Sequence, residues 1–433
     1  MSDVGKLSRS NFIKSAGVLT INGVSMANGE EKGGDGGNSF AGLPIGAVGR
    51  SIRDFGVLPE NSAAENAANL QRGIDWAAEC GAALYVEPSD EPYRVAGGLV
   101  LKQNASLVGV HGPVGRGTRH PEKIHPVGSV FAIEDESQPF LTVEHATQIR
   151  GIQFWYPKQT LTDPAEIIAY PPTIQVSRTK GAQGVTLSCL TFFGEYLAMD
   201  FNASRALICE QILFEHCYGY PLSGTFIQVD YCYDIPRILH CHANPANRRF
   251  LDGEYSREVV DAVIARKTFC YLIDHTDNAQ VIDLFTFGTW GGIRLGAATY
   301  GQLTNFNLDC VGVGIHKLGD DPFNRNWQIC QGSIIANTGA PVGDIHPIII
   351  EGVGHTALTN IECFSGKNHA LTAEGQSQDF LLVRGDEFLS VSLVGCQMRN
   401  YVAGDPVTVE NPEALVQAVA CVDKDGKPYN RTC

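Results

Sequence analysis

The sequence is poor in charged residues, and especially in basic ones. Charged residues make up 18% of the 433 residues, and 47 acidic side chains against 32 basic ones give a formal net charge of −15. Binding to nucleic acid without sequence preference needs a basic face, so we do not expect a nucleic-acid partner. The chain also lacks any run of eighteen apolar residues, so we expect no membrane-spanning helix and no membrane partner.

Several catalytic and cofactor motifs are missing as well. The sequence has no phosphate-binding loop, no dinucleotide-binding fingerprint in a βαβ setting and no G-x-S-x-G elbow. Its thirteen cysteines include no C-x-x-C pair, and histidines do not accompany them at zinc-finger spacing. We therefore predict neither a cofactor nor a set of metal ligands made from these residues.

Glycine is abundant, with 47 residues, and hydrophobic residues make up 44% of the chain. This composition suits a turn-rich β protein better than a helical one. From residue 130 onward, short apolar runs recur, each following a turn and ending in Cys or Phe. The shortest interval is about 23 residues, as expected for a β-helix coil of three short strands and three turns. The runs are Ile149–Phe154, Val185–Cys189, Ile212–Cys217, Ile238–Cys241, Phe306–Cys310, Ile361–Cys363 and Val391–Cys396.

The N-terminal part contains a recognisable block over residues 52–112. A short strand is expected at 52–56, an amphipathic helix at 62–80 and a strand at 83–86, followed by Pro88 and Tyr93. This order resembles the first segment of the pectate-lyase-like superfamily, whose "DFGA" strand leads to a capping helix and then to the first coils.

The resemblance implies an all-β fold, a right-handed parallel β-helix with an N-terminal capping helix, and carbohydrate as the substrate. We expect residues 1–40 to be a signal-like, flexible segment and residues 41–405 to form the β-helix domain. Residues 406–433 are expected to be a C-terminal tail that packs along the outside of the helix.

The first residues indicate where the protein acts. Ser8-Arg9-Ser10-Asn11-Phe12-Ile13-Lys14 resembles the twin-arginine export signal, with Ser10 in place of the second arginine. This predicts a secreted or periplasmic protein; the alternative is an N-terminal tail without a signal.

The cysteines are expected at equivalent inward positions of successive coils, where they would form a ladder of buried thiols. Cys421 and Cys433 lie apart from this ladder and would be free to form a disulfide in an exported protein.

Three aspartates are the candidate catalytic residues. Asp200, Asp230 and Asp274 each end an apolar strand, and aligned coils would place them in one column on an outer face, about 4.8 Å apart. Like charges this close raise each other's pKa, which favours a functional site. Adjacent coils would give the carboxylate spacing of a retaining glycosidase, and alternate coils that of an inverting one. The alternative is that each aspartate caps a turn.

Other side chains near this column are candidates for binding a sugar. An insertion between Asn244 and Thr268, with a short helix expected at 255–266, would form one wall of a groove. Aromatic faces stack on sugar rings, and basic side chains or histidine hold hydroxyl or carboxylate groups. The candidate binding residues are Tyr231, Tyr233, Arg237, His240, Lys267, Trp290 and Lys317.

These observations favour a glycoside hydrolase that cleaves a polysaccharide or oligosaccharide with the aspartate carboxylates. A polysaccharide lyase is the first alternative, in which the aspartates would bind Ca²⁺ and neutralise a uronate. A non-catalytic, tailspike-like glycan-binding β-helix is the second. A homotrimer is open under each alternative, because β-helices often form trimers.

Overall fold

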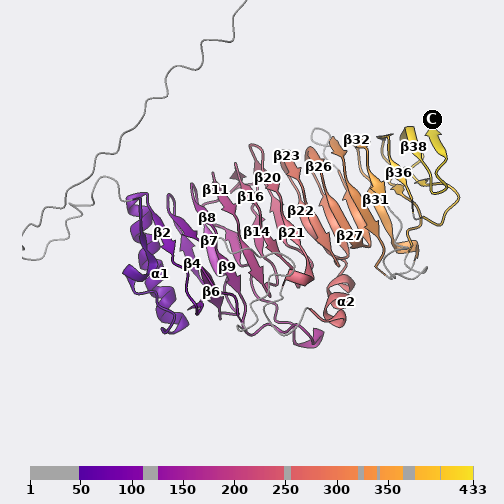
Figure 1. The fold of residues 1–433 in the computed structure, drawn as a ribbon. Coiled ribbons are helices and arrows are strands. Elements are labelled where there is room, and N and C mark those ends of the chain that lie inside the picture. Colours follow the sequence, from indigo (N-terminus) through magenta and orange to yellow (C-terminus); the bar gives the residue numbers. More distant parts are fainter. Residues whose placement is uncertain are drawn as a thin grey trace, which may run out of the picture. The chain divides into compact units, whose positions relative to one another are not determined.

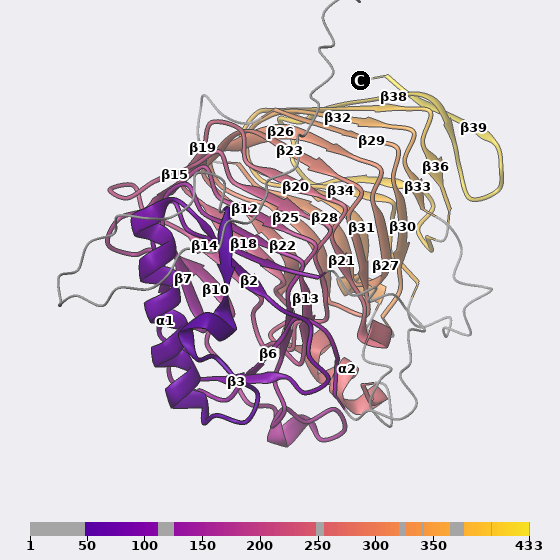
Figure 2. The same ribbon diagram turned by 60° about the vertical axis from the view of Figure 1, so that its left-hand side comes forward.

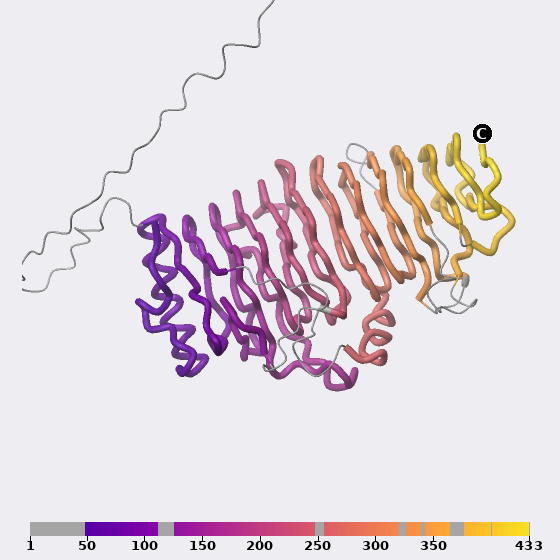
Figure 3. Tube along the Cα trace, viewed as in Figure 1, coloured from indigo at the N-terminus to yellow at the C-terminus, as the bar shows by residue number. Residues whose placement is uncertain are grey.

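The computed structural model describes residues 48–110, 125–247, 255–319, 326–338, 342–363, 376–399 and 401–432. Val48–Cys433 form one structural unit, and the predicted signal-like segment 1–40 lies outside the described residues. This unit is the predicted right-handed parallel β-helix, in which successive coils stack along one axis (Figures 1 and 3). Its handedness follows the general rule for parallel crossovers.

One face of the coils is an eleven-stranded, entirely parallel sheet. Its neighbouring strands come from successive coils, so strands far apart in sequence lie side by side. In spatial order it contains β4 (Leu99–Leu101), β7 (Leu141–Val143), β10 (Ile174–Val176), β14 (Met199–Asn202), β18 (Ile227–Asp230), β22 (Phe269–Ile273), β25 (Gly291–Leu295), β28 (Val313–Lys317), β31 (His346–Ile350), β34 (Leu381–Val383) and β37 (Val407–Val409).

The other faces belong to a 28-stranded sheet that contains two long parallel ladders. The first ladder is β1 (Gly49–Ser51), β2 (Ala83–Val86), β5 (Ser106–Gly109), β8 (Gln148–Arg150), β12 (Thr186–Ser188), β16 (Leu213–Glu215), β20 (Arg237–Leu239), β23 (Thr276–Ile282), β26 (Thr299–Thr304), β29 (Trp327–Cys330), β32 (Gly354–Thr359), β35 (Leu389–Val394) and β38 (Leu415–Val422). The short strands β11 (Ala182–Gln183), β15 (Cys209–Glu210) and β19 (Cys232–Tyr233) join it at β23.

The second ladder follows the first in each coil (Figure 2). It contains β3 (Tyr93–Val95), β6 (Val130–Ile133), β9 (Gln153–Trp155), β13 (Thr191–Phe193), β17 (Tyr218–Gly219), β21 (His242–Ala243), β24 (Phe285–Phe287), β27 (Asn307–Val311), β30 (Ser333–Ala336), β33 (Glu362–Cys363) and β36 (Gln397–Met398).

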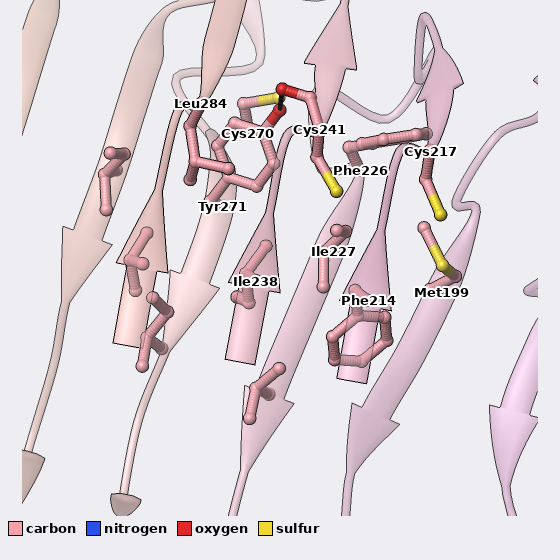
Figure 4. Close-up of a cluster of buried hydrophobic side chains, with 14 of the residues drawn as sticks. Met199, Phe214, Cys217, Phe226, Ile227, Ile238, Cys241, Cys270, Tyr271 and Leu284 are labelled. Carbon is pink, nitrogen blue, oxygen red and sulfur yellow. Dashed lines mark hydrogen bonds between the residues drawn. The ribbon is translucent and has the colours of Figure 1, made fainter. Parts of the chain in front are cut away.

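The core runs through the inside of the coils because no single coil can bury its own side chains. Strand alternation places Ile174 and Val176 inside, whereas Gln175 between them points outward. Aromatic side chains of neighbouring coils stack inside, as Phe154 and Phe192 do with ring centroids 5.1 Å apart. Figure 4 shows a part of this core.

In the part of the chain that the structure describes, two α-helices are attached to the coils. Helix α1 (Ala63–Cys80) packs against β2, β3 and β4 as the predicted capping helix. The Ser62 side chain accepts the N–H of Glu65 at its start, and Gly81 ends it in the left-handed conformation. Helix α2 (Arg257–Ala265) matches the helix expected in the insertion. Neither is long and apolar enough to cross a membrane, and the same is true of every helix in the described residues.

The described residues also contain four short 3₁₀ helices: Ile52–Phe55, Pro164–Glu166, Pro245–Asn247 and Val342–Asp344. The first of them corrects the strand expected at 52–56. The Ser51 side chain accepts the N–H of Arg53, and this bond starts a helical turn where the apolar pattern indicated an extended one.

The C-terminal residues do not form the predicted external tail. Strand β37 pairs with β34 and strand β38 pairs with β35, so both sheets continue into this region. Strand β39 (Pro428–Arg431) then folds back antiparallel to β38. The reason is that Val416, Ala418 and Cys421 are buried inside the last coil.

The cysteines form stacked pairs instead of one continuous ladder. Cys209 lies beside Cys232, Cys217 beside Cys241 and Cys396 beside Cys421, each pair on adjacent coils. Cys189 departs from the prediction because it occupies a turn with φ 55°. Cys421 belongs to an inward pair and is a free thiol, and Cys433 lies outside the described residues.

Candidate active site on the eleven-stranded sheet

Two of the three predicted aspartates lie side by side at the edge where the strands of the eleven-stranded sheet end. Val229 of β18 pairs with Ile273 of β22, and Asp230 and Asp274 are the next residues. The N–H of Asp274 donates to the carbonyl of Val229 over 2.8 Å, so the parallel pairing continues to this point. Adjacent parallel strands are about 4.8 Å apart, so the two aspartates are neighbours in one column.

Asp200 is not in that column. It pairs with Gln228, and Asn202 pairs with Asp230, so Asp200 lies two residues earlier. Its side chain is engaged in a local network: Arg178 donates to the carboxylate over 2.7 Å, Gln228 over 2.6 Å and the N–H of Asn202 over 3.0 Å. The predicted three-member column is therefore wrong at Asp200, and so is its alternate-coil pairing with Asp274.

Asp230 has a histidine partner that the sequence did not reveal. Nδ1 of His275 lies 2.7 Å from a carboxylate oxygen of Asp230. The Tyr231 ring stacks on His275 with centroids 4.3 Å apart and planes within 5°. Tyr231 and His275 both have positive φ, 52° and 37°, because they occupy the same turn position in successive coils. This turn holds the imidazole against Asp230.

Asp274 has different surroundings. Arg294 on the next coil lies 3.4 Å from its carboxylate, and the N–H of Ala297 donates to it over 2.9 Å. Its side chain is 19% exposed. Burial raises the pKa of Asp274, and the nearby charge of Asp230 raises it further. Arg294 lowers it, but the net result is a pKa above the ordinary value. Asp274 therefore holds a proton more readily than an ordinary aspartate does.

Further ionisable side chains extend this cluster along the same sheet. Arg294 pairs in register with His316, whose Nε2 lies 2.7 Å from Glu351, and Arg384 on the following coil also donates to Glu351. Burial alone would raise the pKa of Glu351, but the bonds from His316 and Arg384 outweigh it and lower that pKa to about 2. We call this cluster the polar band: Asp230, Asp274, His275, Arg294, His316, Glu351 and Arg384.

Predicted binding residues Trp290 and Lys267 lie together at the edge where the strands of this sheet begin, opposite the edge that carries Asp230 and Asp274. Trp290 forms an apolar cluster with Val313, Ile349 and Leu382 on this sheet, and Ile264 of α2 packs against the same cluster. The ammonium of Lys267 sits 4.8 Å from the centre of a Trp290 ring and 3.0 Å from Asp344. The insertion thus borders the sheet through α2, but at this edge and not beside the aspartates as predicted, and Trp290 is buried instead of open to a sugar. Residues 248–254 of the insertion lie outside the described residues.

Three predicted binding residues follow Asp230 in sequence but lie beyond a corner of the coil. Tyr233 is in β19, and burial raises its pKa, with smaller contributions from Tyr231 and Asp230. Arg237 belongs to the first ladder. His240 occupies the turn after that strand, 2.8 Å from Asp283. Arg237 and His240 therefore do not join the polar band, although only a few residues separate them from Asp230.

Lys317 was expected to hold an acidic sugar from a surface loop, but its side chain is fully buried. It ends β28, where it pairs with Leu295 and Ile350 on neighbouring coils at an inward position. Its ammonium donates to the carbonyl of Val353 inside the coil. The placement predicted for Lys317 is therefore wrong. Residues 320–325 of the same polar stretch lie outside the described residues, and Trp327 is in the core.

Within the described residues, no group of three or more His, Cys, Asp or Glu side chains is placed to hold a metal ion. Asp230 and Asp274 instead have protein partners, His275 and Arg294.

Comparison with known proteins gives similarities of fold. No family model and no curated protein sequence matches the chain. The enzymatically active domain of tailspike protein 2 of bacteriophage CBA120 is similar, with a TM-score of 0.52 and 10% identity, over 85% of this chain and 52% of that one. The pre-mature gene product 12 of bacteriophage phi29 has a TM-score of 0.51 and 10% identity, over 88% and 58%. The A-module of mannuronan C-5 epimerase AlgE6 of Azotobacter vinelandii has a TM-score of 0.46 and 12% identity, over 86% and 99%.

At these identities the likeness shows the fold, and the chain spans a little over half the length of the two phage structures. Together with the stacked parallel strands, it places the chain among proteins with a right-handed parallel β-helix fold. The resemblance in its N-terminal segment implied the same class.

Proposed function

We propose that the protein is a carbohydrate-active enzyme that hydrolyses glycosidic bonds of a polysaccharide or oligosaccharide. One observation carries this proposal. Asp230 and Asp274 are neighbours at one edge of a parallel sheet, and their surroundings differ. Asp274 has a raised pKa, whereas Asp230 is hydrogen-bonded to His275. Paired carboxyl groups in unequal environments are the arrangement that acid and base roles require.

The spacing of the pair favours a retaining mechanism. Strand separation places the two residues about 4.8 Å apart, near the 5–5.5 Å between carboxylates of retaining enzymes. Asp274 would protonate the glycosidic oxygen while an oxygen of Asp230 bonds to the anomeric carbon and the leaving group departs. Water would then attack the anomeric carbon, Asp274 would take its proton and Asp230 would be released. His275 acts by holding the Asp230 carboxylate in place.

A polysaccharide lyase is the second candidate, and Arg294 is the observation that favours it. Its Nε is buried and has no hydrogen-bond partner among the described residues, although a terminal nitrogen contacts Asp274. A guanidinium with a free donor beside Asp274 could hold a uronate carboxylate. A lyase also needs a base that removes the C5 proton, and the predicted binding residues Lys267, Arg237 and His240, which have basic side chains, lie elsewhere. Calcium remains a proposal for this lyase only.

The two chemistries are separated by a polysaccharide panel read for reducing ends and for the ultraviolet absorbance of unsaturated products. Asp274→Asn and Asp230→Asn are the test variants. Asp283→Asn is the matched control, because Asp283 is also paired with a histidine but on another face. A hydrolase gives reducing ends without unsaturation, lost in both test variants, retained in the control and insensitive to a calcium chelator.

Other outcomes change the assignment. Unsaturated products that Arg294→Gln abolishes would establish the lyase, and their loss with a chelator would add calcium to it. Equal activity in all three aspartate variants would remove the polar band as the active site. Binding without any product would favour the non-catalytic, tailspike-like protein. Export to the periplasm or medium and a homotrimeric state are parts of the same proposal, checked by cell fractionation and by light scattering.

A further inference from the structure

A second candidate binding site lies at the N-terminal end of the coils, on a different face from the polar band. A cavity of about 500 Å³ opens on the outer side of strands β3, β6 and β9 of the second ladder. Its floor contains Ala132 and Trp155, and its rim contains Arg94, Glu134, His125 and Glu91. This volume is within the range of small-molecule sites in proteins.

The strand register explains the hollow. Arg94 of β3, Ala132 of β6 and Trp155 of β9 are in register on adjacent coils. The neighbours of Ala132, Phe131 and Ile133, point into the core, so Ala132 points outward. A methyl group between an arginine and an indole leaves a gap in the outer surface, and prolines close it at the sides.

The indole of Trp155 has an unused hydrogen-bond donor. Its Nε1 is buried and has no partner in the part of the chain that the structure describes. A buried donor without an acceptor costs free energy, and native structures rarely leave one without a reason. An acceptor supplied by a ligand in the cavity would satisfy this N–H.

Side chains of the rim pair with one another, a basic group with a carboxylate in each pair. Arg94 donates to both carboxylate oxygens of Glu134, over 2.6 and 3.2 Å. His125 lies 3.1 Å from Glu91 through Nε2, and its ring is 5.8 Å from that of Trp155. With Glu60, the lining has three carboxylates against one guanidinium and one imidazole. This charge disfavours phosphate, sulfate or a uronate.

We propose that the cavity is a second carbohydrate-binding site, separate from the cleavage site, that takes a neutral sugar. The apolar face of a pyranose would lie on the Trp155 ring and beside the prolines. Its hydroxyl groups would donate to the carboxylates of the rim, and a ring or hydroxyl oxygen would accept the Nε1–H. The apolar floor and hydrogen-bonding rim match a molecule with one apolar and one polar side.

An adjoining cavity indicates that the site takes more than one sugar. It has a volume of about 640 Å³ and shares Pro59 and Glu91 with the first. Its lining adds Arg53, Ser89 and Asp90, which supply hydrogen-bond donors and acceptors. The described residues of the lining include no aromatic side chain. The geometry suits an oligosaccharide anchored by one residue on Trp155, with the next residue held by polar contacts.

The test is isothermal titration of the full-length Asp274→Asn protein, so that slow cleavage does not interfere, with neutral oligosaccharides, oligouronates and amino-sugar oligomers. In that protein we expect one binding event that requires Trp155. Trp155→Ala should abolish it, and Trp155→Phe, which keeps a ring but removes the donor, should weaken it about tenfold. Ala132→Met should block the cavity from its floor. Trp76→Phe, in an indole on α1 outside the cavity, is the matched control and should leave binding unchanged.

The outcomes separate this proposal from the cleavage reaction. A second binding event that survives Trp155→Ala belongs to the polar band and does not affect the proposal. Equal affinity and stoichiometry in Trp155→Ala, Trp155→Phe and Ala132→Met would overturn it, as would binding at Trp155 of oligouronates alone. Thermal melting of each variant shows that it is folded. If Trp155→Ala does not fold, Ala132→Met and Trp155→Phe decide.

Discussion

Glu351 should contribute to stability in a pH-dependent way that can be measured separately from any enzymatic activity. Its carboxylate is held by His316 and Arg384, and its pKa is lowered from 4.5 to about 2. At about 1.4 kcal/mol per pH unit, this difference corresponds to an upper value of about 3 kcal/mol. The side chain is 21% exposed, and solvent screening reduces the expected contribution to about 1–2 kcal/mol.

The sign follows from the lowered pKa. The folded protein binds this proton less readily than the unfolded chain, so the stabilisation is fully present above about pH 4.5. It is lost as the pH falls toward 2, where the folded carboxyl group is also protonated. Glu351→Gln should therefore lower the unfolding free energy by about 1–2 kcal/mol at neutral pH, and its difference from wild type should shrink on acidification.

Urea unfolding of wild type and variant at several pH values measures this difference. Glu410→Gln is the matched control. Glu410 follows Val409 in β37 as Glu351 follows Ile350 in β31, but it is exposed and has no ion pair among the described residues. We expect the control to have little effect at any pH. A Glu351→Gln effect that is the same at acidic and neutral pH would refute the assigned ion pair.

Two further predictions concern other residues. If Asp274 is the proton donor, its raised pKa predicts that hydrolysis persists below that pKa and falls as the pH rises through it, which a pH–rate profile checks. Arg294→Gln removes the cation that lowers the pKa of Asp274, so it should shift the alkaline limb of the profile to higher pH. An unchanged alkaline limb in this variant would contradict the assignment. Ala420 has φ 56°, a conformation that costs L-residues about 1–2 kcal/mol, so Ala420→Gly should raise the free energy of unfolding. Ala68→Gly, on the exposed side of α1, should lower it by about 1 kcal/mol. Urea unfolding measures both changes, and changes of the same sign would contradict the reasoning.

The fold could be predicted because its signal repeats along the chain. Apolar runs returned in coil after coil, and the first segment carried a known order of strand, helix and strand. The C-terminal coil was missed although Val416 and Ala418 alternate as earlier strands do. Strand length was the harder quantity. The prediction ended β14 at Asp200, but Phe201 is buried and the strand continues to Asn202. The apolar side chain of Phe201 was the sequence feature that could have shown that the strand continues two residues beyond Asp200.

The partners of the aspartates could not be predicted in the same way. His275 and Tyr231 face each other because both residues adopt a positive φ in equivalent turns. Glycine or asparagine would indicate such a conformation in the sequence, but histidine and tyrosine do not. Arg294 reaches Asp274 from the next coil, a contact that depends on register. Lys317 was misplaced because a charged side chain usually points outward, whereas here its ammonium is bonded to a carbonyl inside the coil.

The parallel ladder fixes how far apart Asp230 and Asp274 lie, but the following coil decides what each carboxylate can do. The residue after Asp274 in the column is Gly296, because Ile273 pairs with Leu295. A Cβ at Gly296 would lie 1.4 Å from a carboxylate oxygen of Asp274, so any side chain there would displace the carboxylate. Glycine lets Asp274 lean over the next coil, where Arg294 and the N–H of Ala297 reach it. Asp230 has Asp274 itself as its neighbour in that position and leans toward His275 instead. The two environments therefore differ because the column changes from aspartate to glycine at this coil. In the proposed mechanism, this change separates the proton donor from the nucleophile.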